Sequence, residues 1–302
     1  MKTYVSPRQV ARALGVSEST LKRWCDRGLI PMQKTAGGHR RMAVSDVIAF
    51  LRDSGQELAQ PELLGLPAAV GRTQWTLDRA RDQILRALID GQHDVVSEIV
   101  VSLLVAGHDL PAIFDTVVAP ALHELGERWS CGDVVIYEER RASELCMGML
   151  RELRNRLQPS RRAGRQNAIG ATLEHDVYTI PVTMAELVLL DAGWNATSLG
   201  SNLPVDTLRD AIETLRPELF WLSVSYVENA ATFQTELVIL KRAAETVGCR
   251  FIVGGQAVTR SDLSEFPGVE HCHSFRGFAE AIESTEASPS EDQPSRSLAL
   301  SN

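Results

Sequence analysis

The hydrophobic period of this 302-residue chain changes near residue 160, and this change constrains the fold more than any other feature. Between residues 76 and 157, apolar residues recur at spacings of three and four, in four segments separated by short turns. Between residues 167 and 284, short apolar runs alternate with helical segments. The first pattern predicts a four-helix bundle over residues 76–158. The second predicts an α/β, Rossmann-like domain with a doubly wound parallel sheet over residues 166–284, so the chain is multidomain.

A third pattern precedes the bundle. The segment "SPRQVARAL" predicts a short helix with Ser6 as N-cap and Pro7 at the first helical position, and "VSESTLKRW" restarts a helix at Ser17 after Gly15. The glycine pair in "TAGGHRRM" forces a tight turn and predicts a β-hairpin wing, and "SDVIAFLRDSG" predicts another capped helix. Together these segments predict a winged helix-turn-helix head over residues 1–55.

The other segments are expected to connect or follow the domains. Residues 56–75 hold Pro61, Pro67 and several glycines and predict a linker, and "QPSRRAGRQ" breaks the helical pattern before the sheet domain. Residues 285–302 are polar and rich in Ser and Pro, which predicts a disordered tail. No apolar run approaches the roughly 18 residues of a membrane span, and no apolar signal segment opens the chain. We therefore expect a cytoplasmic protein without membrane contact.

The charge is unevenly distributed. The chain carries a net charge of -8, yet residues 1–55 contain ten Lys or Arg against four Asp or Glu. The head is therefore basic at about +6 and the remainder acidic at about -14. Phosphate binding needs positive surface, so the head and not the body is predicted to meet a polyanion.

The order of helix, turn, helix, "TAGGHRRM" wing and helix resembles the winged-helix domain of the MerR family of transcription regulators. This resemblance implies double-stranded operator DNA as partner and a homo-oligomer, either dimer or tetramer. The second helix would enter a major groove while the wing lies against phosphate. The residues expected to contact DNA are Ser19, Thr20, Lys22, Arg23, Arg27, Lys34, Gly37, Gly38, His39, Arg40 and Arg41.

In the sheet domain, an open parallel sheet binds ligands beyond the carboxyl ends of its strands. Three loops lie there, namely residues 172–181, "SVSYVEN" and "GGQAV". Gly254 and Gly255 allow close backbone approach, and Ser223 and Ser225 offer hydroxyl groups. These residues alone predict a ligand pocket without saying which ligand it takes.

A bundle and such a sheet behind a MerR-like head resemble the cobalamin-binding regulators of the CarH and CarA type. In these regulators the bundle carries a Trp, nine residues and Glu-His. Here Trp129 and Glu139 fit, and Arg140 stands where the histidine would be. In light-responsive members a histidine directly follows the Trp, and here the next residue is Ser130. Trp129 is interpreted either as a cap over a ligand or as a core residue.

The same family has an Asp/Glu-x-His-x-x-Gly loop whose histidine ligates cobalt from below. Here Asp176 keeps the acid, Tyr178 replaces the histidine and Pro181 replaces the glycine. A phenol is a poor ligand because its ordinary pKa lies near 10. His175 and Cys131 are the nearest substitutes, but a lone loop histidine is more often solvated and a lone cysteine more often packed. The cobalt-ligand motif is therefore interpreted as degenerate.

Metal chemistry is not otherwise indicated. The five cysteines are widely spaced and form no C-x-x-C, so neither a disulfide framework nor a zinc site is predicted. In "EHCHS" only the two histidines, His271 and His273, share a strand face, which is too few ligands for zinc.

The predicted function is a DNA-binding transcription regulator, for instance a repressor, whose sensor module has a cobalamin-binding fold without the cobalt-ligating histidine. Two alternatives stay open. One is a sensor or photoreceptor that binds cobalamin base-on or another tetrapyrrole such as bilin or haem. The other is an interaction protein that acts on a partner protein as an antirepressor. We expect no enzymatic activity, because no barrel-length segment remains for the catalytic domain that cobalamin-dependent enzymes need.

Overall fold

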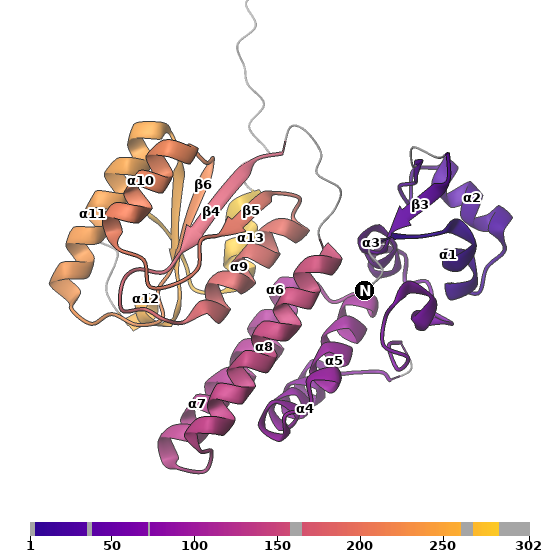
Figure 1. Cartoon of the computed structure of the whole chain (residues 1–302), viewed down its shortest axis with the longest axis horizontal. Coiled ribbons are helices and arrows are strands. Elements are labelled where there is room, and N and C mark those ends of the chain that lie inside the picture. The colour runs from indigo at the N-terminus through magenta and orange to yellow at the C-terminus, as the bar shows by residue number, and fades with distance from the viewer. Residues whose placement is uncertain (1–3, 35–37, 72, 158–164, 261–267, 284–302) are drawn as a thin grey trace, which may run out of the picture.

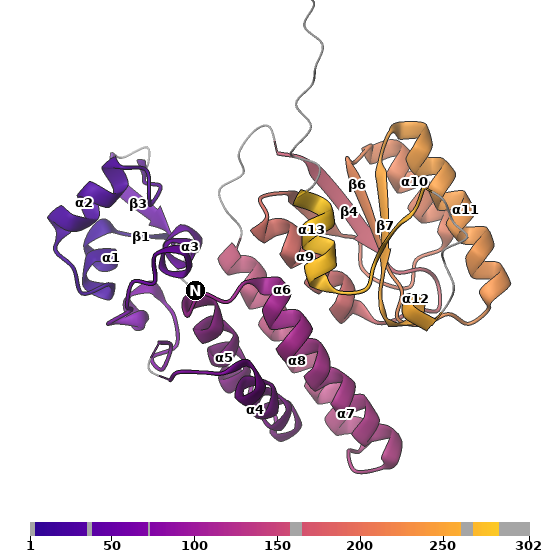
Figure 2. The ribbon, with the colours of Figure 1, turned by 180° about the vertical axis from the view of Figure 1, so that it is seen from behind.

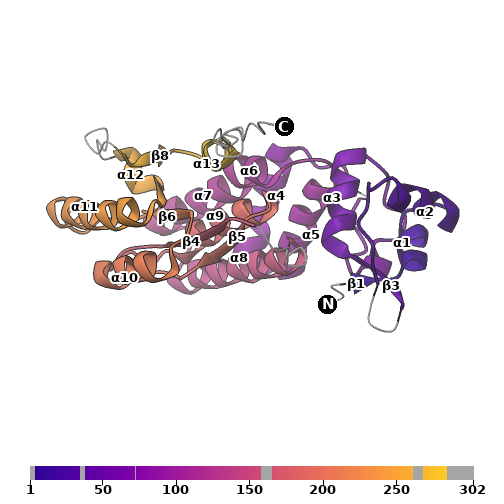
Figure 3. The same cartoon turned by 90° about the horizontal axis from the view of Figure 1, so that it is seen from above.

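The computed structural model of the chain describes residues 4–34, 38–71, 73–157, 165–260 and 268–283. A small head, a helical bundle and a sheet domain follow one another along the molecule, with the bundle in the middle (Figures 1 and 3). This confirms the predicted multidomain class with its parallel α/β sheet. Gly37 of the expected DNA-contacting set, part of the basic segment before the sheet, and the tail over residues 285–302 lie outside the described residues.

The helix pair of the head forms because its caps are in place. α1 (Pro7–Ala13) begins after Ser6, which forms a capping box with Gln9. α2 (Glu18–Asp26) begins after Ser17, whose side chain accepts a hydrogen bond from the Thr20 N–H. Gly15 adopts a φ of 65° in the turn between them, a conformation that glycine tolerates at little cost.

A three-stranded antiparallel sheet and a third helix complete the head. β2 (Gln33–Lys34) and β3 (Arg40–Ala43) form the wing hairpin, and β1 (Tyr4–Val5) pairs with the other edge of β3. α3 (Val44–Ser54) begins without a side-chain cap, and Ser45 Oγ is buried with no hydrogen-bond partner in the part of the chain that the structure describes. The predicted helix is present, but the expected side-chain cap at its start is wrong.

The segment expected as a linker packs against the head. Its short 3-10 helix η1 (Pro61–Leu64) lies against α1, and the Ala59 and Gln60 N–H groups donate to the Ala13 carbonyl. Leu64, Leu66 and Val70 are buried in the same core as α1 to α3. Burial of these apolar side chains holds this segment against the head, although its composition predicts a linker.

The bundle contains four helical rods. They are α4 (Leu77–Asp90), α5 (His93–Val105), the continuous rod of α6 (Leu110–Ile113), η2 (Phe114–Val118) and α7 (Ala119–Cys131), and α8 (Ile136–Leu157). η2 is a turn of π-helix in which the Ala119 N–H reaches the Phe114 carbonyl. Pro120 has no N–H to continue the ordinary pattern, which accounts for the bulge.

The sheet domain has five parallel strands in the order β5-β4-β6-β7-β8. They are β4 (Asn167–Ala171), β5 (Asn195–Ser198), β6 (Leu219–Ser223), β7 (Arg250–Gly254) and β8 (Glu270–Cys272). The helices are α9 (Thr179–Asp191), α10 (Val205–Leu215), α11 (Ala230–Val247), the short α12 (Gln256–Arg260) and α13 (Phe275–Glu283). α10 and α11 cover one face, and α9 and α13 lie between the other face and the bundle (Figure 2).

The bundle and the sheet domain are joined by a shared core and by polar contacts. Apolar residues of both belong to one buried cluster, and the rings of Phe114 and Phe275 meet edge to face at 5.4 Å. Asp115, on the π-helical turn, accepts hydrogen bonds from the Phe275 and Arg276 N–H groups at 2.8 and 2.9 Å. The bulge in the bundle therefore caps the first turn of α13.

The head is attached to both other parts. Val101 and Val105 of α5 are buried in the head's own core. Arg52, near the end of α3, donates from Nη1 to both oxygens of Asp191 at the end of α9, at 3.1 and 2.8 Å. Head, bundle and sheet domain therefore meet at one junction.

Candidate DNA interface and sheet-edge site

The outer face of α2 is exposed and basic. Leu21 is buried, and Trp24 packs against Phe50 with ring centroids 4.9 Å apart, which fixes the inner face. The opposite face therefore presents Ser19, Lys22 and Arg23 to solvent. This is the geometry in which a second helix can lie in a groove of DNA.

The wing and the end of α2 extend the same basic character. Five of the residues expected at DNA lie outside α2 and are exposed, namely Arg27, Lys34, Gly38, His39 and Arg40. Thr20 of α2 and Arg41 of the wing are partly exposed. The β2–β3 hairpin pairs Gln33 with Arg41 and Lys34 with Arg40. Cationic side chains on a hairpin beside a groove-sized helix suit phosphate contact.

Asp176 is the centre of the sheet edge. It is 2% exposed, and its carboxylate accepts hydrogen bonds from the Tyr178 N–H at 3.1 Å, the Ser225 N–H at 2.7 Å and the Tyr226 N–H at 3.3 Å. Burial raises the pKa of Asp176, and these three N–H groups oppose the rise without cancelling it. The carboxylate joins the loop after β4 to the loop after β6.

The loop after β4 is braced from the other side by Asn202, which sequence analysis missed. The Asn202 N–H donates to Thr172 Oγ1 at 2.9 Å, and its Oδ1 accepts from the His175 N–H at 2.8 Å. His175 is held at a φ of 70°, with its Nε2 3.4 Å from Glu228. His175 and Asn202 both have a positive φ, which histidine and asparagine adopt more often than most non-glycine residues, but residue type alone does not mark these two positions.

Tyr178 is the N-cap of α9 and its side chain is 56% exposed. Pro181 lies in the first turn of α9, where a helix does not need its backbone N–H. The expected ligand loop therefore has its own local reason for a proline, and it presents a phenol to solvent at the position expected for the ligand.

The paired glycines are tightly packed by the chain itself. A Cβ at Gly254 would lie 2.9 Å from the Cys272 carbonyl oxygen, and one at Gly255 would lie 2.3 Å from the Val224 carbonyl oxygen. Gly255 also has a φ of 124°, a conformation almost restricted to glycine. Ser223 is 7% exposed and Ser225 partly exposed. Packing of the strands is enough to require both glycines.

The bundle residues of the predicted site lie at the α7–α8 turn. Trp129 is 48% exposed, Glu139 accepts a hydrogen bond from Ser143 Oγ at 3.0 Å, and Arg140 is well exposed with its Nε 3.5 Å from Glu139. Among the described residues, no hydrogen bond or ion pair joins these three side chains to Asp176 or Tyr178. Gln256 Nε2 and His123 Nδ1, 3.4 Å apart, connect the sheet edge to α7 instead.

Both regions expose large apolar side chains. At the α7–α8 turn these are Trp129, Val135, Ile136 and Tyr137, and at the sheet edge they are Val177, Tyr178 and Tyr226. We call these seven residues the apolar rim. Where such side chains form a contiguous patch, they mark a surface that contacts a ligand or another protein, and we interpret each of the two groups in this light.

These contacts do not fit a corrinoid held from below by a histidine. The position expected for the ligand carries Tyr178, and the nearby His175 has its ring beside Glu228. The carboxylate of Asp176 is engaged by three backbone donors. Among the described residues, no three His, Cys, Asp or Glu side chains are grouped as they would be to hold a metal ion.

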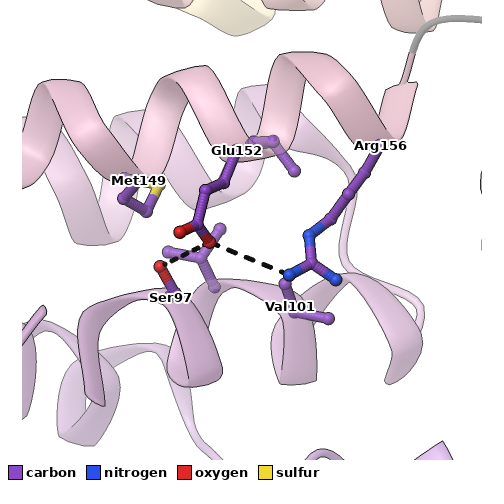
Figure 4. A pocket seen from close by; sticks show the side chains of 7 residues that line it. Ser97, Val101, Met149, Glu152 and Arg156 are labelled. Atoms are coloured by element: carbon purple, nitrogen blue, oxygen red, sulfur yellow. Dashed lines mark hydrogen bonds and ion pairs between the residues drawn. The ribbon is translucent and has the colours of Figure 1, made fainter. Parts of the chain in front are cut away.

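A narrow groove lies elsewhere, between α5 and α8, and is lined by Ser97, Val101, Met149, Glu152 and Arg156 (Figure 4). Glu152 accepts a hydrogen bond from Ser97 Oγ at 3.2 Å and lies 3.8 Å from Arg156, which is 7% exposed. Burial lowers the pKa of Arg156, and its Nε has no hydrogen-bond partner among the described residues. Because Glu152 already balances the charge of Arg156, we interpret these contacts as holding α5 and α8 together.

Two family models match the chain. The model described as "Helix-turn-helix domain" matches residues 4–54, and the model described as "B12 binding domain" matches residues 80–154. The first covers the head, and the second covers most of the bundle. No helix in the described ranges has the length and apolarity to cross a membrane.

Two curated proteins and one solved structure resemble it over most of its length. The HTH-type transcriptional repressors CarH and CarA of Myxococcus xanthus are 28% and 25% identical, each over 82% of this chain and over 87% and 85% of their own lengths. The monomethylamine corrinoid protein of Methanosarcina barkeri superposes with a TM-score of 0.54 at 13% identity, covering 70% of this chain and 100% of that one. The last likeness concerns the fold.

These findings and the architecture of the head and the sheet domain agree on one kind of protein. The chain is a DNA-binding regulator of the helix-turn-helix type that carries a sensor module of the cobalamin-binding type.

Proposed function

We propose that this regulator binds operator DNA through α2 and the wing, in the cytoplasm, as a homo-oligomer and without enzymatic activity. The observation that carries the proposal is the exposed basic face of α2, continued by Lys34 and Arg40 on the hairpin. One head covers a single half-site, so two heads are needed for a paired operator.

The test is a titration of duplexes that tile the DNA adjoining the gene, followed by fluorescence anisotropy at several salt concentrations. The double change Arg40→Ala with Arg41→Ala weakens binding about tenfold or more and lowers the salt slope by about 1 for each lost phosphate contact. The control removes two exposed arginines from the body, Arg151→Ala with Arg242→Ala. Equal weakening by both pairs, or no binding to any duplex, contradicts the proposal.

We further propose that the sensor module does not hold cobalamin through a histidine below the cobalt. Support comes from the exposed phenol of Tyr178 and from the three backbone N–H groups that donate to the carboxylate of Asp176. The test adds adenosylcobalamin to the purified protein, removes free ligand by gel filtration and records the absorption spectrum. A spectrum in which the corrinoid's own base has left the cobalt contradicts this point.

The apolar rim favours a second candidate, a sensor that takes cobalamin base-on or another flat tetrapyrrole. Three of its aromatic side chains, Trp129, Tyr178 and Tyr226, are about half exposed. Such rings can stack on a flat ligand at the edge of the sheet. A retained colour with the base still on cobalt supports this candidate, and a colourless protein points to a protein partner.

The junction at Arg52 is the proposed route from sensor to head. Its ion pair with Asp191 joins α3 to α9, and α9 begins at the edge loop through Tyr178. A ligand or partner that displaces α9 would change the free energy of head docking only if it binds one arrangement better than the other. Changing this pair is therefore expected to alter DNA affinity without removing the DNA surface.

A further inference from the structure

Trp221 has an unusual place in the sheet. It lies in β6, is 2% exposed, and belongs to the core on the α9 side, whereas its neighbours Phe220 and Leu222 face α10 and α11. A Cβ at Gly170, its register partner on β4, would lie 2.0 Å from two indole ring carbons. The indole therefore lies over Gly170, in the space that any larger residue there would need.

The indole also reaches the helix. Its Nε1 donates to the Val182 carbonyl of α9 at 3.4 Å. Trp221 thus spans β6, β4 and α9 and fills the layer between the sheet and that helix.

This layer lies directly beneath the sheet-edge loop. The loop with Asp176 and Tyr178 joins the end of β4 to the start of α9. Any extension of a ligand that passes below this loop must enter between the strand and the helix that the loop connects. The indole of Trp221 already lies between them.

An indole is a planar bicyclic ring with one N–H donor. A benzimidazole, the base at the end of the nucleotide tail of cobalamin, has the same bicyclic shape. The two rings therefore compete for one space, and only the indole is covalently part of the chain.

We propose that Trp221 is the built-in occupant of a site for a planar bicyclic nitrogen heteroaromatic ring, and that it restricts ligands to the outer side of the sheet edge. This deepens the proposed function and rests on it, because it names the residue that excludes a corrinoid tail from the interior. Replacing Trp221 by a small residue opens the site.

The first test measures thermal unfolding of Trp221→Ala with and without added 5,6-dimethylbenzimidazole or indole. Both probes raise the melting temperature of this variant and leave the wild type unchanged. The matched control is Phe220→Ala, which opens a hole in the core on the other face of the same strand. Trp221→Leu keeps part of the packing and serves if the alanine variant does not fold. Equal stabilisation of both cavity variants, or of neither, overturns the proposal.

The second test separates a site that is open to the edge from a sealed core. Adenosylcobalamin is added to Trp221→Ala and to the same variant with Tyr178→His. The proposal expects the double variant to bind the corrinoid with its base off cobalt. Variants that bind free 5,6-dimethylbenzimidazole but do not bind the corrinoid through its tail overturn the proposal. A wild-type protein that itself takes the corrinoid in this form instead overturns the proposed function, whatever the variants do.

Discussion

The head and the sheet edge differ in what their polar groups contact. In the head, Lys22, Arg23 and Arg40 point to solvent, so the surface is available to an external partner. At the sheet edge, Asp176 accepts hydrogen bonds from three backbone donors, and the two glycines pack closely against the chain itself. An external partner binds to polar groups that are not already used within the fold, whereas the fold itself depends mainly on its buried core. The chain can therefore retain the folds of both the head and the sheet domain, while only the head retains the side chains expected of its binding site.

The largest effect is expected from Asp176→Ala. The change leaves the Tyr178, Ser225 and Tyr226 N–H groups without their acceptor and lowers the free energy of unfolding by about 3 kcal/mol. Chemical denaturation measures it. Glu174→Ala, an exposed acid in the same loop, is the control and stays near the wild type. A stable Asp176→Ala would mean that this carboxylate is held for a ligand and not for the loop.

Gly255→Ala is expected to cost about 2 kcal/mol of unfolding free energy. Its Cβ would press on the Val224 carbonyl oxygen at a φ that alanine disfavours. The control is Gly126→Ala in α7, where a Cβ has no neighbour within 4 Å. Ligand-free protein that tolerates Gly255→Ala would restore the interpretation of this glycine as a ligand contact.

Arg52→Ala is expected to lower the free energy of unfolding by about 1 to 2 kcal/mol, because it leaves the carboxylate of Asp191 without its charged partner. Burial raises the pKa of Asp191 even with Arg52 present. The double change Arg52→Ala with Asp191→Ala recovers part of the loss in a double-mutant cycle. Additive losses would mean that head and sheet domain are not coupled through this pair.

The smallest effect is expected from Arg140→His. The arginine side chain is 77% exposed, so the change alters stability by less than about 0.5 kcal/mol. It also restores no corrinoid binding by itself, because Tyr178 and Trp221 stay in place. Absorption spectra after gel filtration with adenosylcobalamin measure this, and a coloured Arg140→His protein would place the defect in the bundle alone.

Local signals in the sequence predicted most of the helices and strands, but not β1, η1 or α12. Ser6 and Ser17 cap the helices they were expected to cap, and the order of short apolar runs predicted the parallel sheet. The packing of residues 61–70 against the head was missed, because proline and glycine mark a connection whether or not it is buried. The absent cap of α3 was missed because Ser45 lies within the helix.

Long-range pairs had no such signal. Arg52 and Asp191 are 139 residues apart, and each occurs in a segment where charged residues are ordinary. Trp221 stands in "LFWLSVS", a run apolar on both faces, so its spacing does not tell which layer the indole fills. Gly254 and Gly255 were expected at a ligand, but a missing side chain serves close strand packing equally well.

The most direct test of the account is an operator-binding isotherm measured with and without saturating adenosylcobalamin, in the dark and after illumination, on one preparation. The account predicts specific binding with the same affinity in all conditions, and binding that is about tenfold weaker or more when Arg40 and Arg41 are replaced by alanine. An affinity that changes with adenosylcobalamin, together with a spectrum in which the corrinoid's base has left the cobalt, would contradict it.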